Sequence, residues 1–361
     1  MLRNRKFDFF LFLPMIFLLG FGIATVGSVS PENLVTHLFY IAAALIFFFI
    51  FSFLDLEILF SLSPFIYVSC LLFLALPFIV GTVTRGSVRW VPLAGFTIQP
   101  SEIVKPFLAL VASWYWTKEE FSFKRLGMFV LLALPVLALI FLSPDLGSTL
   151  VVLSIAFGVI FVSGIRLKHV LVIAFLGLLI VPFFWFSLRD YQKMRIIHFI
   201  NPYSDPLGEG YNLIQAKISV GSGGFFGRGL GRGTQSHLAF LPEKHTDFAF
   251  ASLAEESGFW GSFAVIALYV FLYLRLLTII KSSPNKHLFL LMVGIFCGLV
   301  FQTVVNLGMN IGILPIAGVT LPLISYGGSS LLATMISLGM VQGAFKESNE
   351  EKPLEIGRAH V

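Results

Sequence analysis

The chain has 361 residues, of which 57% are hydrophobic and 12% are charged, and its formal net charge is +5. Soluble domains carry about 25% charged residues. The composition therefore argues against a soluble enzyme, a nucleic-acid-binding module or a disordered protein, and indicates a polytopic membrane protein. The positive charge is the Lys and Arg excess expected of cytoplasmic loops, so no nucleic acid partner is predicted. Cys70 and Cys297 fall in apolar runs and are predicted to be packing residues rather than a disulfide or zinc framework.

Ten apolar runs are long enough to span the roughly 30 Å hydrocarbon core of a bilayer. We therefore predict an all-α polytopic membrane protein with about ten transmembrane helices. The first run is too long for a cleaved signal peptide and is expected to stay as an anchor. The runs fall at residues 8–28, 36–54, 57–81, 101–116, 126–142, 147–165, 169–187, 257–280, 287–308 and 326–345.

The distribution of Lys and Arg predicts the orientation. Lys and Arg precede the first run and gather in the loops on the same side, whereas the short loops on the other side carry only Arg85 and Arg89. Both termini are therefore predicted to be cytoplasmic. Residues 82–100 and 188–256 then lie outside, and the second segment, between helices 7 and 8, is long enough to be functional.

Residues 1–345 are predicted to form a single transmembrane domain. A charged cytoplasmic tail is expected at 346–361. Its end, residues 354–361, is expected to be in part a remnant of an expression vector and is left out of the functional reasoning.

The fourth run opens with the polar sequence 99–105, in which Glu102 and Lys105 are three residues apart and can pair on one helix face. With Ser101 as the expected N-cap, this pattern fits a structural ion pair and a helix cap. Because ionisable residues at membrane depth mark functional sites, it equally fits the polar floor of an outward-facing cavity. Asp145, between the fifth and sixth runs, leaves the same two alternatives open: a helix cap or a cavity residue.

The long outer segment contains a glycine-rich run at 221–235 that includes Arg228 and Arg232. Glycine allows the backbone to approach a ligand closely, and arginine supplies fixed positive charge for phosphate. The run lacks the Gly-Lys-Ser/Thr ending of a P-loop and the strand and helix of a Rossmann motif. A phosphate-binding loop and a flexible linker both remain open.

Four carboxylates follow the glycine-rich run, at the head of a predicted membrane helix: Glu243, Asp247, Glu255 and Glu256. Packing alone does not explain such a group, and a carboxylate base beside cationic phosphate binders is the favoured chemistry. The spacing of His245 and Asp247 does not match a zinc protease.

The last outer loop, residues 314–330, is rich in proline and glycine and contains no Lys or Arg. Paired prolines and glycines at membrane depth favour re-entrant backbone that lines a cavity. A structural kink in a helix is the alternative.

Several ordered motifs resemble the SEDS family (shape, elongation, division and sporulation) of bacterial cell-wall polymerases over nearly all of residues 8–345. The motifs are Arg89-Trp90, Gln99-Pro100-Ser101-Glu102 with Lys105, Pro144-Asp145-Leu146-Gly147, Leu241-Pro242-Glu243, His245-Thr246-Asp247-Phe248, Ala254-Glu255-Glu256 and Pro322-Leu323-Ile324-Ser325-Tyr326-Gly327-Gly328-Ser329. Within the family, members that act in cell elongation are resembled most, through Asn201-Pro202, Asp205-Pro206-Leu207-Gly208 and Gly233-Thr234-Gln235.

The resemblance implies a peptidoglycan glycosyltransferase of the bacterial cytoplasmic membrane. It would polymerise lipid II into glycan strands during cell elongation, release undecaprenyl diphosphate, and work with a class B penicillin-binding protein that crosslinks the strands. A divalent cation, Mg or Mn, is left open. Asp247 matches the family's essential aspartate. The other residues expected to line the cavity or bind substrate are Glu102, Lys105, Arg89, Asp145, Arg195, Arg228, Arg232, Gln235, Glu243, His245, Thr246, Ser325 and Tyr326.

Elementary chemistry agrees with this assignment. A lipid diphosphate leaving group needs charge neutralisation but no proton donor. A sugar hydroxyl acceptor needs a base that is ionised at neutral pH, and an aspartate with a reference pKa of about 3.9 qualifies. Attack on an α-linked donor to give a β-linkage is a single inverting displacement, so one carboxylate suffices.

Two alternatives from other classes compete with the enzyme. A lipid II flippase would use the same charged cavity, and a scaffold would only recruit the transpeptidase. The acidic and glycine-rich motifs cluster on the predicted outer face rather than along a two-sided path, which favours the enzyme. A scaffold alone would not need carboxylates at membrane depth.

Overall fold

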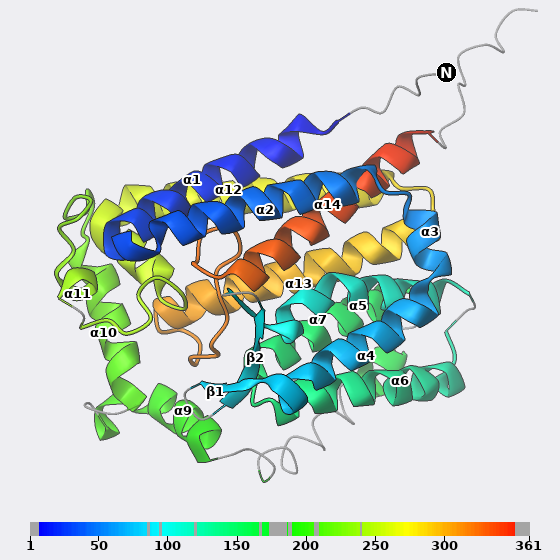
Figure 1. Ribbon diagram of the computed structural model, residues 1–361, viewed down its shortest axis with the longest axis horizontal. Coiled ribbons are helices and arrows are strands. Elements are labelled where there is room, and N and C mark those ends of the chain that lie inside the picture. Colours follow the sequence, from blue (N-terminus) through cyan, green and yellow to red (C-terminus); the bar gives the residue numbers. More distant parts are fainter. Residues whose placement is uncertain are drawn as a thin grey trace, which may run out of the picture.

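The computed structural model describes residues 7–84, 87–93, 96–118, 121–165, 168–172, 186, 190–205, 209–238 and 240–350. Long helices lie side by side along one direction, with the start of α1 and the end of α14 at one end of the bundle and α10 and α11 at the other (Figure 1). The long helices are α1 (Phe9–Val29), α2 (Leu34–Phe53), α4 (Ser63–Val80), α5 (Pro100–Thr117), α6 (Phe123–Leu142), α7 (Leu146–Val162), α12 (Ala249–Ser282), α13 (Lys286–Asn310) and α14 (Gly328–Glu350).

These helices correspond to nine of the ten predicted spans, and the tenth, 169–187, lies largely outside the described residues. The third predicted span is divided into α3 (Leu56–Ser61) and α4, because a proline occupies the first turn of α4. Within the described residues, seven helices are long and apolar enough to cross a membrane, and α7 is a shorter apolar helix. The all-α polytopic membrane fold is thus confirmed, while the count of spans and the orientation stay predictions.

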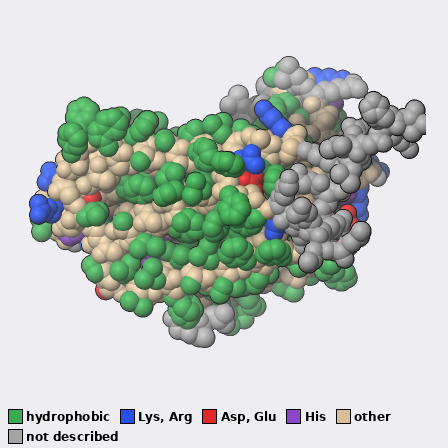
Figure 2. Space-filling view, turned by 90° about the horizontal axis from the view of Figure 1, so that it is seen from above, with side chains coloured by type: hydrophobic (Ala, Val, Ile, Leu, Met, Phe, Trp, Pro, Cys, Tyr) green, Lys and Arg blue, Asp and Glu red, His purple; other side chains and the backbone are tan. Residues whose placement is uncertain are grey.

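The surface of the bundle is apolar. Figure 2 shows hydrophobic side chains over most of the described surface on one face, with few charged side chains among them. Phe9, Phe65 and Ile79 are 71%, 73% and 77% exposed, respectively. Exposed apolar area on this scale is unfavourable in water and is expected where the solvent is lipid.

α13 lies at the centre of the bundle, in contact with α5, α7, α12 and α14. α14 packs along α2, and α1 packs along α12. Close helix contacts depend on small residues: a Cβ at Gly22 of α1 would lie 2.9 Å from the carbonyl oxygens of Leu323 and Ile324. At the end of the bundle where α1 begins, Arg275 Nε donates to the Asp8 carboxylate over 2.9 Å and ties α12 to α1.

The segment at 82–100, predicted to lie outside, forms a small antiparallel sheet that the sequence did not predict. Its strands are β1 (Thr82–Thr84), β2 (Ser87–Leu93) and β3 (Phe96–Ile98), in the order β1-β2-β3. Trp90 pairs with Thr82, and Val91 pairs with Ile98. The sheet leads directly into α5 and so sets where the polar start of that helix lies.

The described residues of the segment at 188–256 include several helices. It contains α9 (Asp190–Ile200), α10 (Glu209–Ser222) and α11 (Thr234–His237), and it ends in the first turns of α12. α10 directly precedes the glycine-rich run.

α12 is broken at Gly258, where φ is 66° and ψ is −158°. The glycine-rich run binds across this break: Phe259 N donates to Gly224 O over 2.8 Å, and Gly229 N donates to Glu256 O over 2.9 Å. The glycine-rich run thereby provides hydrogen-bond partners for backbone groups that lack a partner within the interrupted helix.

Cysteine labelling tests the predicted orientation. In a chain with Cys70 and Cys297 replaced by alanine, Phe226→Cys should react with a membrane-impermeant maleimide in spheroplasts, because Phe226 is 84% exposed in the predicted outer segment. Ser61→Cys, exposed at the end of α3, is the matched control and should react only after permeabilisation. The reverse pattern would contradict the orientation.

Candidate active site

Glu102 and Lys105 form the predicted ion pair in the first turns of α5. The Lys105 Nζ and Glu102 Oε1 atoms are 2.6 Å apart, and both side chains are buried. Ser148 Oγ donates to Glu102 Oε1 over 3.2 Å, and Lys105 Nζ lies 3.5 Å from Gln302 Oε1. A cavity of about 20 Å³, enough for about one water molecule, lies beside the pair. The pair is therefore a structural ion pair that also borders a small cavity, and its place in a substrate cavity stays a prediction.

The predicted cap at Ser101 is wrong. α5 begins at Pro100, with Gln99 in the N-cap position and no side-chain cap bond. Ser101 Oγ instead donates to Asp145 Oδ2 over 2.6 Å, and Gln99 Nε2 donates to the same oxygen over 2.7 Å. A buried carboxylate recruits these donors because its charge is costly without them.

Asp145 combines the two roles that the sequence left as alternatives. Its Oδ1 caps α7 by accepting from Ser148 N over 3.1 Å, and its Oδ2 joins the start of α5. Burial raises the pKa of Asp145, but the charge of Arg89, the Ser101 hydroxyl and the charge of Lys105 outweigh it and hold the pKa below its usual value. The carboxylate therefore stays ionised at neutral pH.

Arg89 lies on β2 and reaches toward the same region. Its Nε donates to the carbonyl oxygen of Ser143 over 3.1 Å. The unforeseen sheet thus carries the guanidinium that compensates Asp145. Arg89, Glu102, Lys105 and Asp145 form one network, and their role in lining a substrate cavity stays a prediction.

Asp247 lies in a tight turn, residues 243–248, just before α12, and its side chain is half-buried. The turn begins at Glu243, whose φ of 49° is left-handed. Glu243 O accepts from Thr246 N and Phe248 N, and Glu243 Oε2 accepts from Thr246 Oγ1 over 2.9 Å. Lys244 O accepts from Ser252 Oγ over 2.9 Å.

Partners from distant segments hold the next two carbonyls of the turn. Tyr326 N donates to His245 O over 2.8 Å, and Ser325 Oγ donates to Thr246 O over 2.6 Å. The ring centroids of His245 and Tyr326 are 5.4 Å apart, in an edge-to-face arrangement. The structure thus brings the candidate residues of the turn, from Glu243 to Asp247, together with Ser325 and Tyr326.

Ser325 and Tyr326 belong to the segment between α13 and α14. This segment contains no regular helix or strand in its described residues, and residues 321–325 are buried. Non-helical backbone here is what the proline and glycine pattern predicted. Leu323, with φ of 69°, is in the left-handed region.

A row of amide side chains on α13 connects the Glu102–Lys105 pair with the Asp247 turn. The sequence analysis did not identify this row. Gln302, Asn306 and Asn310 are four residues apart and lie on one face of the helix. Gln302 contacts Lys105, whereas Asn306 Nδ2 and Asn310 Nδ2 each lie 3.0 Å from Asp247 O. The sequence did contain a signal for this row, namely amide residues at regular spacing of four in an apolar helix.

The glycine-rich run forms a third cluster and is not a flexible linker. Glu255 Oε1 accepts from Gln235 N over 2.8 Å, and Glu255 Oε2 accepts from the Ser236 N–H and hydroxyl. Arg228 Nη1 donates to Thr234 Oγ1 over 3.0 Å, so its side chain also holds the run together.

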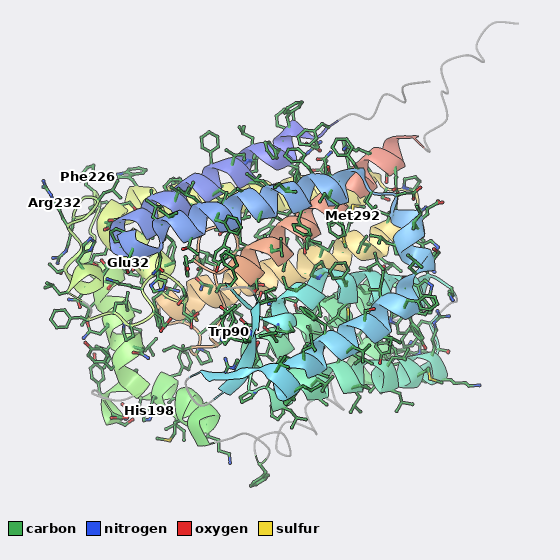
Figure 3. The ribbon with its side chains drawn as sticks, in the orientation of Figure 1. Glu32, Trp90, His198, Phe226, Arg232 and Met292 are labelled. Carbon is green, nitrogen blue, oxygen red and sulfur yellow. The ribbon has the colours of Figure 1, made fainter. Side chains whose placement is uncertain are left out.

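The two remaining candidate cations are Arg232 and Arg195. Arg232 is exposed and points outward at the edge of the molecule (Figure 3). Arg195 belongs to α9, and its side chain lies outside the described residues.

Among the side chains that the structure describes, no three of the His, Cys, Asp and Glu type come together as ligands for a metal ion. Mg²⁺ is commonly held by one or two carboxylates together with the phosphates of a substrate. Involvement of a divalent cation therefore stays a prediction.

Comparison with known proteins identifies the family. Residues 7–350 match the family model FtsW/RodA/SpoVE, described as a cell cycle protein. The chain belongs to this family. It is 40% identical over 283 residues to the peptidoglycan glycosyltransferase MrdB of Escherichia coli K12, covering 77% of this chain and 76% of that protein. It is 34% identical over 362 residues to the probable peptidoglycan glycosyltransferase FtsW of Alteromonas naphthalenivorans, covering 94% and 69%.

Solved structures agree with this membership. A chain of a peptidoglycan synthase complex that coordinates polymerization and crosslinking matches with a TM-score of 0.84 and 35% identity, covering 96% of this chain and 99% of that one. The rod shape determining protein RodA of Thermus thermophilus matches with a TM-score of 0.72 and 32% identity, covering 95% and 98%. The SEDS resemblance and its leaning toward RodA are confirmed.

The buried pair on α5 gives a stability prediction. Glu102→Ala leaves the Lys105 charge buried and unpaired, which typically costs about 3–5 kcal/mol. The double variant Glu102→Leu with Lys105→Met removes both charges and should recover most of that loss. Thermal unfolding in detergent measures both, with exposed Glu57→Ala as the control. Equal losses in the single and double variants would contradict a charge-pairing role.

Proposed function

We propose that this chain, a peptidoglycan glycosyltransferase like its relatives, polymerises lipid II into glycan strands during cell elongation, in the bacterial cytoplasmic membrane. Undecaprenyl diphosphate would be the leaving group. The observation that carries the proposal is the Asp247 turn: a half-buried carboxylate on a backbone whose carbonyls are held by three other segments, in a chain of this family.

Asp247 is proposed as the general base that takes the proton from the attacking sugar hydroxyl. A carboxylate held by a rigid backbone fits this task, since a base must stay within hydrogen-bond reach of the hydroxyl. Glu243 lies in the same turn and is the second carboxylate near it. Glu255 is not a good candidate, because both its oxygens accept hydrogen bonds from the glycine-rich run.

Charge neutralisation of the diphosphate is proposed to come from cations on the outer side. Exposed Arg232 is better suited than Arg228, whose guanidinium is already used within the run. If Mg or Mn takes part, the carboxylates of the turn, Glu243 and Asp247, would hold it, and it would add positive charge to neutralise the diphosphate. The proposed partner is a class B penicillin-binding protein, supported by the similarity to a chain of a peptidoglycan synthase complex.

Asp247→Asn tests the proposed base. Asparagine is nearly isosteric and keeps the hydrogen-bonded backbone, but it cannot accept the proton. Since general-base catalysis contributes about 10²–10⁴ in rate, the variant should bind lipid II yet lose polymerisation by that factor. Glycan products of the purified protein on lipid II, separated on a gel, are the measurement.

Asp205→Asn is the matched control, because it makes the same chemical change on the predicted outer side, next to η2 (Pro202–Ser204). It should polymerise normally. Wild-type rates from Asp247→Asn would refute the assignment of the base and direct attention to Glu243. A wild-type protein that binds lipid II in this assay but makes no glycan would favour the flippase.

A further inference from the structure

Asn306 and Asn310 hold the backbone of Asp247 through their amide groups. Both are fully buried on α13, and both Nδ2 atoms lie 3.0 Å from the Asp247 carbonyl oxygen. Each of the two side-chain amides also makes a hydrogen bond to another segment. Asn306 Nδ2 also donates to Val319 O over 2.6 Å, and Asn310 Oδ1 accepts from Ala251 N over 2.9 Å.

The two asparagines therefore connect three separate segments at one point. These are the Asp247 turn, the first turn of α12 through Ala251, and the non-helical segment before α14 through Val319. Asn310 Nδ2 lies 2.8 Å from Asn306 O and 3.2 Å from Asn306 Oδ1, which fixes the second amide relative to the first.

Only an amide can make this set of contacts. It offers two N–H donors and one acceptor on a short side chain, whereas a carboxylate would direct lone pairs at the Asp247 carbonyl. Buried amides are costly in an apolar helix unless every group is paired. The arrangement fixes the peptide that follows the Asp247 Cα and hence the direction in which its carboxylate projects.

We infer that Asn306 and Asn310 are positioning residues that set the Asp247 carboxylate for catalysis. The inference rests on the proposed function of Asp247. Neither amide touches the reacting atoms, so both act through Asp247. A misplacement of about 1 Å at a catalytic group can cost about 10²-fold in rate. Loss of either amide should therefore lower kcat on that scale and leave the KM for lipid II unchanged.

The experiment measures kcat and KM of purified Asn306→Ala and Asn310→Ala on lipid II. Thr303→Val is the matched control: Thr303 is buried on the same helix but bonds to the Tyr273 hydroxyl on α12. It removes a buried hydrogen bond at a comparable depth and should keep kcat. Should Asn310→Ala fail to fold, Asn306→Ala carries the test, because it leaves the contact with Ala251 intact.

A second measurement separates positioning from general weakening of the fold. In an Asp247→Asn background, Asn306→Ala should cause no further loss of the residual rate, because the group that it positions is already gone. A further loss as large as in the wild type would overturn the inference. So would normal kcat in both asparagine variants, or an equal kcat loss in Thr303→Val. Normal activity of Asp247→Asn alone would instead refute the proposed base.

Discussion

The site depends on one constraint: a carbonyl group buried inside an apolar bundle must find a donor. Helices meet this requirement internally, but the turn before α12 and the segment before α14 are not helical and cannot. The segment before α14 supplies donors to the turn through Tyr326 N and Ser325 Oγ, and α13 adds the amides of Asn306 and Asn310. The rigidity of the turn is therefore a consequence of burial.

The acidic residues of the site fall into two kinds, which burial separates. Glu102 and Asp145 are 7% and 2% exposed and are fully engaged with Lys105, Ser101 and Ser148. Their charges are compensated within the bundle, as expected of groups that shape a cavity. Asp247 is half-buried, with its backbone fixed and its side chain nearer the solvent. Such a group suits chemistry on a molecule that arrives from outside.

What could be predicted from the sequence was mostly local. The Glu102–Lys105 pair follows from a spacing of three on a helix, and the apolar runs follow from length and composition. The cap at Ser101 was mispredicted because its hydroxyl is taken by Asp145, 44 residues away. Asn306 was missed because its acceptor, Asp247 O, is 59 residues away and is a backbone atom, which every residue has.

The short sheet escaped prediction for a similar reason. β1 and β3 have three residues each, which is too few for an alternating pattern to be visible, and only their pairing with β2 makes them strands. The segment at 188–256 was recognised as long enough to be functional, but its helices α9, α10 and α11 were not predicted. Chain order and composition thus located the site, whereas its hydrogen bonds had to come from the structure.

The break in α12 has a consequence for how this family can be recombined. A Cβ on Gly258 would lie 2.2 Å from Gly227 N, and a Cβ on Gly227 would lie 2.0 Å from Glu256 O, so neither chain segment tolerates a side chain without the other moving. The glycine-rich run and the interrupted helix therefore form one structural unit, in which neither segment can change independently of the other. A chimera that exchanges residues 222–236 will keep this joint only if the exchanged segment also has glycine at position 227.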